Sequence, residues 1–261
     1  MKTNIIYGIV SGALLALSAS AGTVPLDVTN YNFQLPGGGG GALATLNGVP
    51  VQIFCDNFFN DVYVPSTNTA DVTTLSTSAN LDETRFGEVG ASAFTTITLT
   101  DTSSTGTTDD GILNGASGAA RYDMVAYLVS LYNVPAGNTA ANDEVQEAIW
   151  TLMDPTVDGA VLNPNKVDPT SDLEAAAGWY ATMSAPANAT GLNSFLGQFE
   201  VVSDSTMTFT NGLGIGGFQE QIVYTPAPEP SGSIWMLIGL FGVAGFLVQR
   251  SRAKKLAPVA A

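Results

Sequence analysis

The chain has 261 residues, with one cysteine, no histidine and a net charge of −15. The lack of histidine excludes His-dependent catalytic triads, His general bases and zinc sites with His ligands, and the single cysteine excludes an intrachain disulfide. All 23 acidic residues lie between Asp27 and Glu229, where only three basic residues fall, so this part carries a charge of −20. Such a charge argues against nucleic acid and anionic lipid as partners, and it suits a solvated, aggregation-resistant secreted surface.

The first residues have the form of a secretory signal peptide. Met1 and Lys2 precede an apolar run over residues 5–17, and Ala19-Ser20-Ala21 then provides a small-residue cleavage site. This order predicts that residues 1–21 are removed and that residues 22–224 form an extracytoplasmic domain. The alternative, a retained anchor helix, is disfavoured because the apolar run is short.

Strands are expected in the first third of the chain and again in the last. A weak β pattern covers residues 23–33, and two stronger runs, 42–47 and 49–54, flank Asn47-Gly48, which is a strong hairpin signal. Cys55 stands where the second of these runs ends, on rigid backbone that suits a reactive group. Further strands are expected at residues 61–64, 70–75, 93–100, 198–203, 206–210 and 218–224.

The middle third is expected to be helical. Residues 117–132 are apolar nearly all round, which indicates a buried helix. Within residues 142–153 apolar side chains recur at helical spacing; we expect Asn142 or Asp143 to cap this helix and Asp154-Pro155 to end it. The remaining expectations are a helix over residues 171–183 opened by a capping box of Ser171 and Glu174, one or two helical turns within 80–89, and loops over 101–114 and 211–217.

Strands, then helices, then strands predict an α+β domain. We expect the first and last thirds to form a β-sandwich or barrel, with the helices as a central insert. In this arrangement Cys55 on the sheet and Gln146 on the insert would meet at the interface between the two.

Two short motifs carry a resemblance that concerns the same two residues. Phe54-Cys55-Asp56 resembles the aromatic-Cys-x-acid signature of surface-protein thioester domains, and Gln146-Glu147-Ala148-Ile149-Trp150 resembles their Gln-x-Ala-Ile-Trp signature. Val145, where the family usually has Thr, and Asp56, where an apolar residue is frequent, depart from the pattern. The resemblance implies an internal thioester between the Cys55 sulfur and the Gln146 side-chain carbonyl, with Phe54, Asp56 and Trp150 as its environment.

A simpler interpretation of both residues stays open. Asp143 and Gln146 have the spacing of a capping box, in which Gln146 would reach back to the start of its own helix. A lone cysteine after Ile53-Phe54 is often a small buried hydrophobic residue. In that interpretation Cys55 is a free thiol and no bond forms.

The C-terminal residues form a second recognisable pattern. Residues 225–233 are a Pro-rich linker containing Pro228-Glu229-Pro230. An apolar run, residues 234–248, lies in an expected sorting helix of residues 234–249, and residues 250–261 begin with a basic cluster. This order resembles the PEP-CTERM sorting signal, which implies a transmembrane sorting helix, a cytoplasmic tail and processing by an exosortase of a Gram-negative-type bacterium. The alternative is an ordinary C-terminal membrane anchor.

These features predict a non-enzymatic protein of the cell surface, outer envelope or extracellular matrix, anchored transiently in the inner membrane. Through the thioester it would attach covalently to an amine or hydroxyl of a protein or polysaccharide. A non-covalent structural or binding component of the envelope or exopolysaccharide matrix, with a buried free Cys55, is the alternative. An exported hydrolase with paired carboxylates is a third hypothesis. No cofactor or metal is expected.

Overall fold

The computed structural model describes residues 23–34, 40–56, 64–77, 81–94, 96–99, 106–132, 139–153 and 167–225. The chain divides into two units, Met1–Thr225 and Pro226–Ala261. The predicted signal peptide, Pro228-Glu229-Pro230 and the sorting helix lie outside the described residues. Within the described ranges, no helix has both the length and the apolar character that a membrane span requires.

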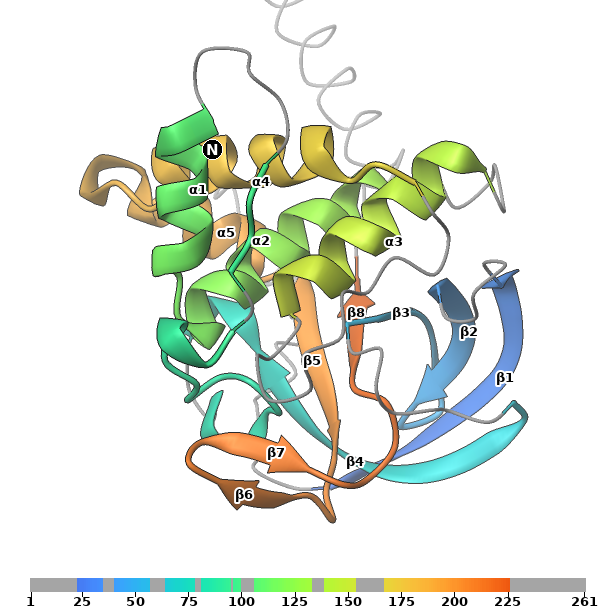
Figure 1. Cartoon of the computed structure of the whole chain (residues 1–261). Helices are drawn as coiled ribbons and strands as arrows, with labels where there is room; N and C mark the ends of the chain where they lie inside the picture. The colour runs from blue at the N-terminus through green and yellow to red at the C-terminus, as the bar shows by residue number, and fades with distance from the viewer. Residues whose placement is uncertain are drawn as a thin grey trace, which may run out of the picture. The chain divides into compact units, whose positions relative to one another are not determined.

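Six antiparallel strands close into a barrel in the order β1-β2-β3-β8-β5-β4 (Figure 1). Four of them come from the first third of the chain and two from the last, which confirms the predicted α+β class and identifies the sheet as a barrel. The strands are β1 (Val24–Gln34), β2 (Gly40–Leu46), β3 (Val49–Cys55), β4 (Ser66–Thr74), β5 (Phe199–Asp204) and β8 (Gln221–Tyr224).

The hairpin of β2 and β3 forms where the sequence predicts it. Asn47 and Gly48 have φ values of 51° and 77°, the left-handed conformation that a two-residue hairpin turn requires. Leu46 and Val49 pair directly on either side of this turn. The register continues to the far end of β3, where Cys55 lies opposite Gln221 of β8.

Side-chain alternation along the strands separates two apolar cores. One face of β3 and β8 places Ile53 and Val223 in a cluster inside the barrel. The other face places Phe54 and Ile222 in a larger cluster shared with the helices. The wall of the barrel is therefore covered by helices at the end of β3.

In its described residues, the insert between β4 and β5 contains five α-helices, which lie on one side of the barrel (Figure 1). They are α1 (Gly106–Gly115), α2 (Gly118–Leu131), α3 (Ala140–Met153), α4 (Thr170–Met183) and α5 (Ala189–Leu196). Short 3₁₀ turns occur at Leu75–Thr77, Leu81–Glu83, Ala91–Ala93 and Pro186–Asn188, and a separate hairpin consists of β6 (Thr208–Thr210) and β7 (Leu213–Ile215).

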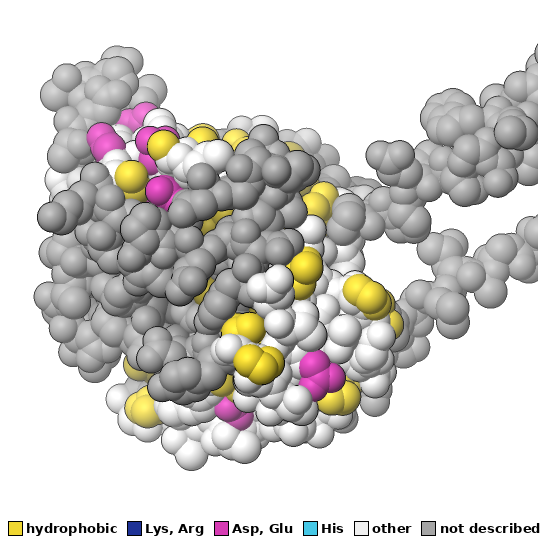
Figure 2. Space-filling view, turned by 90° about the vertical axis from the view of Figure 1, so that its right-hand side faces the viewer, with side chains coloured by type: hydrophobic (Ala, Val, Ile, Leu, Met, Phe, Trp, Pro, Cys, Tyr) yellow, Lys and Arg dark blue, Asp and Glu magenta, His cyan; other side chains and the backbone are white. Residues whose placement is uncertain are grey.

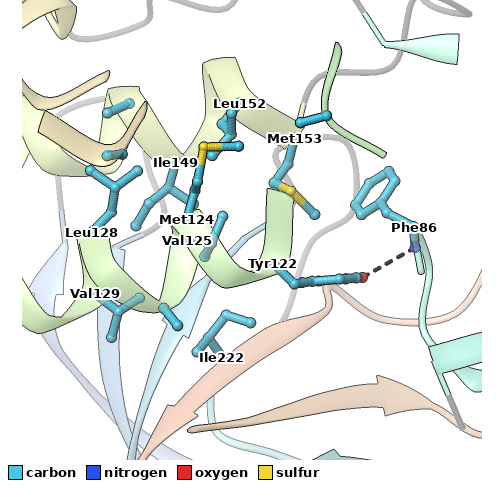
Figure 3. Packing of buried hydrophobic residues seen from close by; sticks show 14 of the residues in the cluster. Phe86, Tyr122, Met124, Val125, Leu128, Val129, Ile149, Leu152, Met153 and Ile222 are labelled. Carbon is cyan, nitrogen blue, oxygen red and sulfur yellow. Dashed lines mark hydrogen bonds between the residues drawn. The ribbon is translucent and has the colours of Figure 1, made fainter. Parts of the chain in front are cut away.

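Helix α2 is the central element of the insert, as its all-round apolar sequence predicts. Ser117 caps its start by accepting the Ala120 N–H. Figure 3 shows α2 between β8 and α3, with Ile222 below it and Ile149 above it. Most of its residues are buried, which explains why α2 has few polar side chains.

Two expectations for residues 93–114 are wrong. The described part of 93–100 forms no strand: Asn114 binds both the N–H and the C=O of Ile97, at 2.8 Å each, and Asp110 accepts the Leu99 N–H at 3.1 Å. Both polar side chains belong to α1, which occupies much of the expected loop 101–114. Because α1 satisfies the backbone of the extended segment, no partner strand is needed.

The expected helix caps are also wrong. Helix α3 begins before Asn142, which is buried within it, and Thr139 accepts the Asn142 N–H at 3.3 Å. Helix α4 begins after Pro169 with no side-chain cap, so the Ser171–Glu174 capping box does not form. Helix α5 and strand β7 were not predicted, and β7 lies inside the expected loop 211–217.

Candidate functional site

Cys55 is the last residue of β3 and is fully enclosed. Its backbone pairs with Gln221 of β8, and only 1% of the residue is exposed. The thiol donates a hydrogen bond to Gln219 Oε1 at 3.0 Å. Burial raises the pKa of the Cys55 thiol to about 12, so the thiol stays protonated at neutral pH.

Gln146 reaches Cys55 from the second turn of α3, on the other side of the interface. Its Nε2 donates to the backbone carbonyl oxygen of Cys55 at 2.7 Å, and its Oε1 accepts from the Tyr132 hydroxyl at 2.7 Å. The side chain is 0% exposed. Because the amide binds the end of β3 and Tyr132, the residue that follows α2, the capping-box interpretation of Gln146 is wrong.

The contact between the two predicted thioester residues runs through the backbone of Cys55. Gln146 touches its carbonyl oxygen, whereas the sulfur makes its hydrogen bond to Gln219. A cysteine sulfur moves by rotation about one bond, Cα–Cβ.

Tyr132 was predicted only as part of an apolar helix face, but it supplies a hydrogen bond at the site. It follows α2 and packs its ring against Phe54, with the ring centroids 4.8 Å apart. Burial, and secondarily the Cys55 and Asp143 charges, raise the pKa of Tyr132 well above its usual range. The hydroxyl therefore keeps its proton and remains a donor to Gln146 Oε1.

Phe54 and Trp150, the aromatic residues of the two motifs, are both buried. Phe54 lies on the face of β3 that meets the helices, and Trp150 lies one turn after Gln146 on α3. Both are about 1% exposed. Together with the burial of Cys55 and Gln146, this packing keeps bulk water away from the pair.

Asp56, the next residue after Cys55, lies beside a second buried carboxyl group. Its backbone N–H donates to the Glu220 carbonyl oxygen at 3.5 Å, and both side chains are 0% exposed. Neither carboxyl oxygen of Asp56 has a hydrogen-bond donor among the described residues. Burial, followed by the Glu220 charge, raises the pKa of Asp56 well above its usual range, and Arg85 partly offsets this.

Glu220, which sequence reasoning missed, accepts hydrogen bonds from three separate parts of the chain. Its Oε2 accepts the Arg85 backbone N–H at 2.7 Å and the Ser203 hydroxyl, and its Oε1 accepts the Tyr122 hydroxyl. Figure 3 shows the Tyr122 hydroxyl directed at the Phe86 backbone nitrogen, whose N–H it accepts at 3.1 Å.

Arg85 forms hydrogen bonds to the backbone of the segment that precedes Glu220. Its guanidinium donates to the carbonyl oxygens of Gly214 at 2.8 Å, Gly216 at 2.8 Å and Phe218 at 3.2 Å. Gln219 and Glu220 come directly after Phe218, so the hydrogen bonds of Arg85 also help to hold the backbone that carries these two side chains. Within the described residues, no group of three or more His, Cys, Asp or Glu side chains could hold a metal ion.

A comparison with protein-family models, curated proteins and solved structures finds no match for this chain. The expectations about attachment and sorting therefore depend on the short motifs and on the geometry of the site. Pro228, Glu229 and Pro230 belong to the part of the chain outside the described residues.

Proposed function

We propose that this chain is an exported, exosortase-sorted protein of the cell surface or extracellular matrix that forms an internal thioester between Cys55 and Gln146. The observation that carries the proposal is the 2.7 Å hydrogen bond from Gln146 Nε2 to the Cys55 carbonyl oxygen, inside a fully buried site. It joins residues 91 positions apart in the sequence, one at a strand end and one on a helix.

The chemistry requires a nucleophile, a polarised carbonyl group and a dry environment. The Cys55 sulfur attacks Gln146 Cδ, the C–N bond of the amide breaks, and ammonia leaves with the thiol proton. The Tyr132 hydroxyl already donates to Gln146 Oε1, the oxygen on which negative charge develops during the attack. Burial of both residues supports a bond that survives until a partner amine or hydroxyl opens it.

The charge of the domain favours a basic partner. Arg85 and Arg121 are the only Lys or Arg residues that the structure describes, and both are buried. Figure 2 shows acidic but no basic side chains among the coloured residues of one face. A partner rich in amines would be attracted to this surface. Lys166 is the single lysine between residues 22 and 225, so copies of the chain offer one another few competing amines.

The hydrogen bond from the sulfur to Gln219 favours a second candidate function. In it, Cys55 remains a buried thiol, and the chain is a non-covalent component of the envelope or exopolysaccharide matrix. Since Asp56 and Glu220 are both fully buried, this carboxyl pair gives no support to the third hypothesis, hydrolysis of an external saccharide.

Intact mass spectrometry of residues 22–225 separates the two candidates. We expect the wild type to be lighter by one ammonia, to show no titratable thiol after denaturation, and to gain one methylamine when methylamine is added. Cys55→Ala and Gln146→Ala should have the full mass. Gln219→Ala is the matched control: it removes the acceptor of the thiol hydrogen bond and should leave the ammonia loss intact.

A full wild-type mass with one thiol released on denaturation would establish the non-covalent alternative. Ammonia loss that disappears in Gln219→Ala and persists in Gln146→Ala would reassign the acyl donor.

The partner class is tested by adding a lysine-rich peptide and its acetylated form to the wild type. Only the amine form should become attached, and high salt should slow the attachment. The mass of the exported full chain reports whether the segment beyond Pro230 is removed.

A further inference from the structure

The hairpin of β6 and β7 leaves one strand edge open. β6 pairs with β7 along its whole length, Thr208–Thr210, and among the described residues it has no second neighbouring strand. Figure 1 shows β6 as the outer strand of this hairpin. All three of its residues are exposed. An unpaired strand edge presents N–H and C=O groups to which another strand can bind.

The hydrogen-bond pattern of the hairpin shows which groups of β6 face outward. The turn residues Asn211 and Gly212 have φ values of 53° and 82°, as in a two-residue hairpin turn, so the residues on either side of the turn form a hydrogen-bonded pair. The next pair, Phe209 and Gly214, is then of the non-hydrogen-bonded type. Gly214 agrees with this: its N–H donates to the Arg85 carbonyl oxygen and its C=O accepts from the Arg85 guanidinium, at 2.8 Å each. The N–H and C=O of Phe209 therefore point away from β7, towards the open side.

The composition of this hairpin differs from that of the rest of the domain. Residues 205–219 contain no Asp, Glu, Lys, Arg or Pro, although the chain between Asp27 and Glu229 carries a charge of −20. Charged side chains and Pro commonly protect an open strand edge, and β6 has neither. Of the four large hydrophobic side chains that are exposed among the described residues, Phe209 and Ile215 belong to this hairpin. These features are typical of an interaction surface.

A second copy of the chain is the partner that this edge fits. Because both outward-facing groups belong to one residue, Phe209, two β6 strands can satisfy each other when they run antiparallel about a two-fold axis at this residue. The uncharged hairpin also lets two acidic chains meet with no like charges in the paired strands. A basic partner would instead be attracted to the acidic parts of the surface.

We propose that β6 is a docking edge for a second copy of this chain. The two β6 strands pair antiparallel and join the two hairpins into one four-stranded sheet, in which the Phe209 residues exchange both backbone hydrogen bonds. In this register Thr208 of one copy lies opposite Thr210 of the other. Since each strand has only three residues, the dimer is reversible and depends on protein concentration. This inference goes beyond the proposed function and does not depend on the thioester.

Paired substitutions at Thr208 and Thr210 test this register through charge. Thr208→Lys/Thr210→Lys brings like charges together at two positions of the dimer, whereas Thr208→Lys/Thr210→Glu brings opposite charges together at the same positions. We expect the first variant to associate at least about tenfold more weakly than the second. Overall repulsion between the chains cannot produce this result, because the first variant has the smaller net charge.

Association is measured on the full chain, exported, purified in mild detergent and followed by sedimentation velocity at rising protein concentration. Every protein carries Cys55→Ala, so that the introduced lysines meet no thioester and no native thiol remains. We expect the Cys55→Ala parent to pass from monomer to dimer. Association through the C-terminal segment would be equal in the two double variants, so the comparison between them isolates the β6 edge.

Disulfide trapping is an independent readout of the same register. A mixture of Thr208→Cys and Thr210→Cys chains should form a disulfide-linked dimer, because opposed residues lie within reach of a disulfide. Either variant alone should cross-link poorly, since equal positions of the two copies are diagonal neighbours about 7–8 Å apart. Val49→Cys, at an exposed position of the β2–β3 hairpin, is the control for random collisions.

Three results would each overturn the inference. They are a Cys55→Ala parent that stays monomeric at every concentration, two double variants that associate equally, and a mixture that cross-links no better than Thr208→Cys alone or Val49→Cys. None of them bears on the thioester, because Cys55 is replaced in all of the proteins compared.

Discussion

At the residue scale, the Tyr132 hydroxyl contributes an interaction that neither motif contains. It lies 2.7 Å from Gln146 Oε1, and its ring packs on Phe54. A donor at this oxygen stabilises the charge that develops when sulfur attacks the carbonyl carbon. The same bond also holds the amide so that its nitrogen faces Cys55.

Tyr132→Phe should slow thioester formation without unfolding the protein. Phenylalanine keeps the ring contact with Phe54 but removes the donor, and loss of one such donor costs about 100-fold in rate. Re-formation after ammonia treatment, followed by intact mass, measures this effect. Tyr127→Phe is the control, because Tyr127 stacks on Trp179 with ring centroids 5.1 Å apart and makes no described contact with Gln146. Equal rates for both variants would show that the Tyr132 hydroxyl has no part in the step.

The sequence predicted Cys55 and Gln146 as a pair but not the residues that complete the site. Each predicted residue stands in a short motif, whereas Gln219 and Glu220 lie in a segment without a chemical pattern. Their positions depend on Arg85, which binds three carbonyl oxygens more than 125 residues away along the chain. Local sequence contains no signal for contacts of that range.

At the element scale, the correct predictions concern features set by local sequence, and the wrong ones concern features set by contacts between distant residues. The hairpin at Asn47-Gly48 and helix α2 follow from local turn chemistry and periodicity, and both are confirmed. Residues 93–100 alternate like a strand, yet Asn114 and Asp110 of α1 satisfy their backbone instead. Strand formation requires a neighbouring strand edge, and the sequence pattern cannot say whether one is present.

Helix α2 depends on a glycine at its first position. Gly118 N–H donates to the Val89 carbonyl oxygen at 2.8 Å, and a Cβ built on Gly118 would lie 1.6 Å from the Phe86 carbonyl oxygen. Gly118→Ala should therefore displace α2 from residues 86–89 and lower the free energy of unfolding by about 1–3 kcal/mol or more. Since Phe86 also donates its N–H to Tyr122, the packing around Glu220 should loosen as well.

Gly178→Ala is the matched control for this change. Gly178 lies inside α4, and nothing lies within 4 Å of the Cβ position. Alanine there should stabilise the protein by about 1 kcal/mol through helix propensity alone. Urea unfolding of both variants checks the pair; a Gly118→Ala variant as stable as wild type would contradict the tight contact at Phe86.

At the scale of the whole molecule, the barrel and the insert are both needed to make the site. Strand β3 supplies Cys55, the segment just before β8 supplies Gln219 and Glu220, and α3 supplies Gln146. These parts come from the first, last and middle thirds of the chain. The proposed bond would therefore connect the barrel directly to the insert and resist their separation.

The acidic charge of the domain should also make its stability depend on pH. Burial raises the pKa of Asp123 to about 7, that of Asp56 well above its usual range and that of Glu200 upward. The folded protein thus keeps protons that the unfolded chain releases above about pH 4, where unperturbed Asp and Glu ionise. The stabilisation is present in full below pH 4 and, for Asp123, is lost as pH rises through 7, so the free energy of unfolding falls with rising pH.

We expect the midpoint of thermal unfolding to be at least about 5 °C higher at pH 5 than at pH 8, since each kcal/mol shifts it by about 2–4 °C in a domain of this size. Asp123→Asn, which cannot lose a proton, should remove part of this difference by raising stability at pH 8 relative to pH 5.

Asp168 provides the opposite control: hydrogen bonds from Thr170 lower the pKa of its carboxyl, so Asp168→Asn should leave the difference unchanged or increase it. Added salt screens the general repulsion between acidic side chains but not the burial of Asp123, so the effect of Asp123→Asn should persist in salt. A midpoint that rises from pH 5 to pH 8 would mean that these carboxyl groups are ionised and well paired in the folded state.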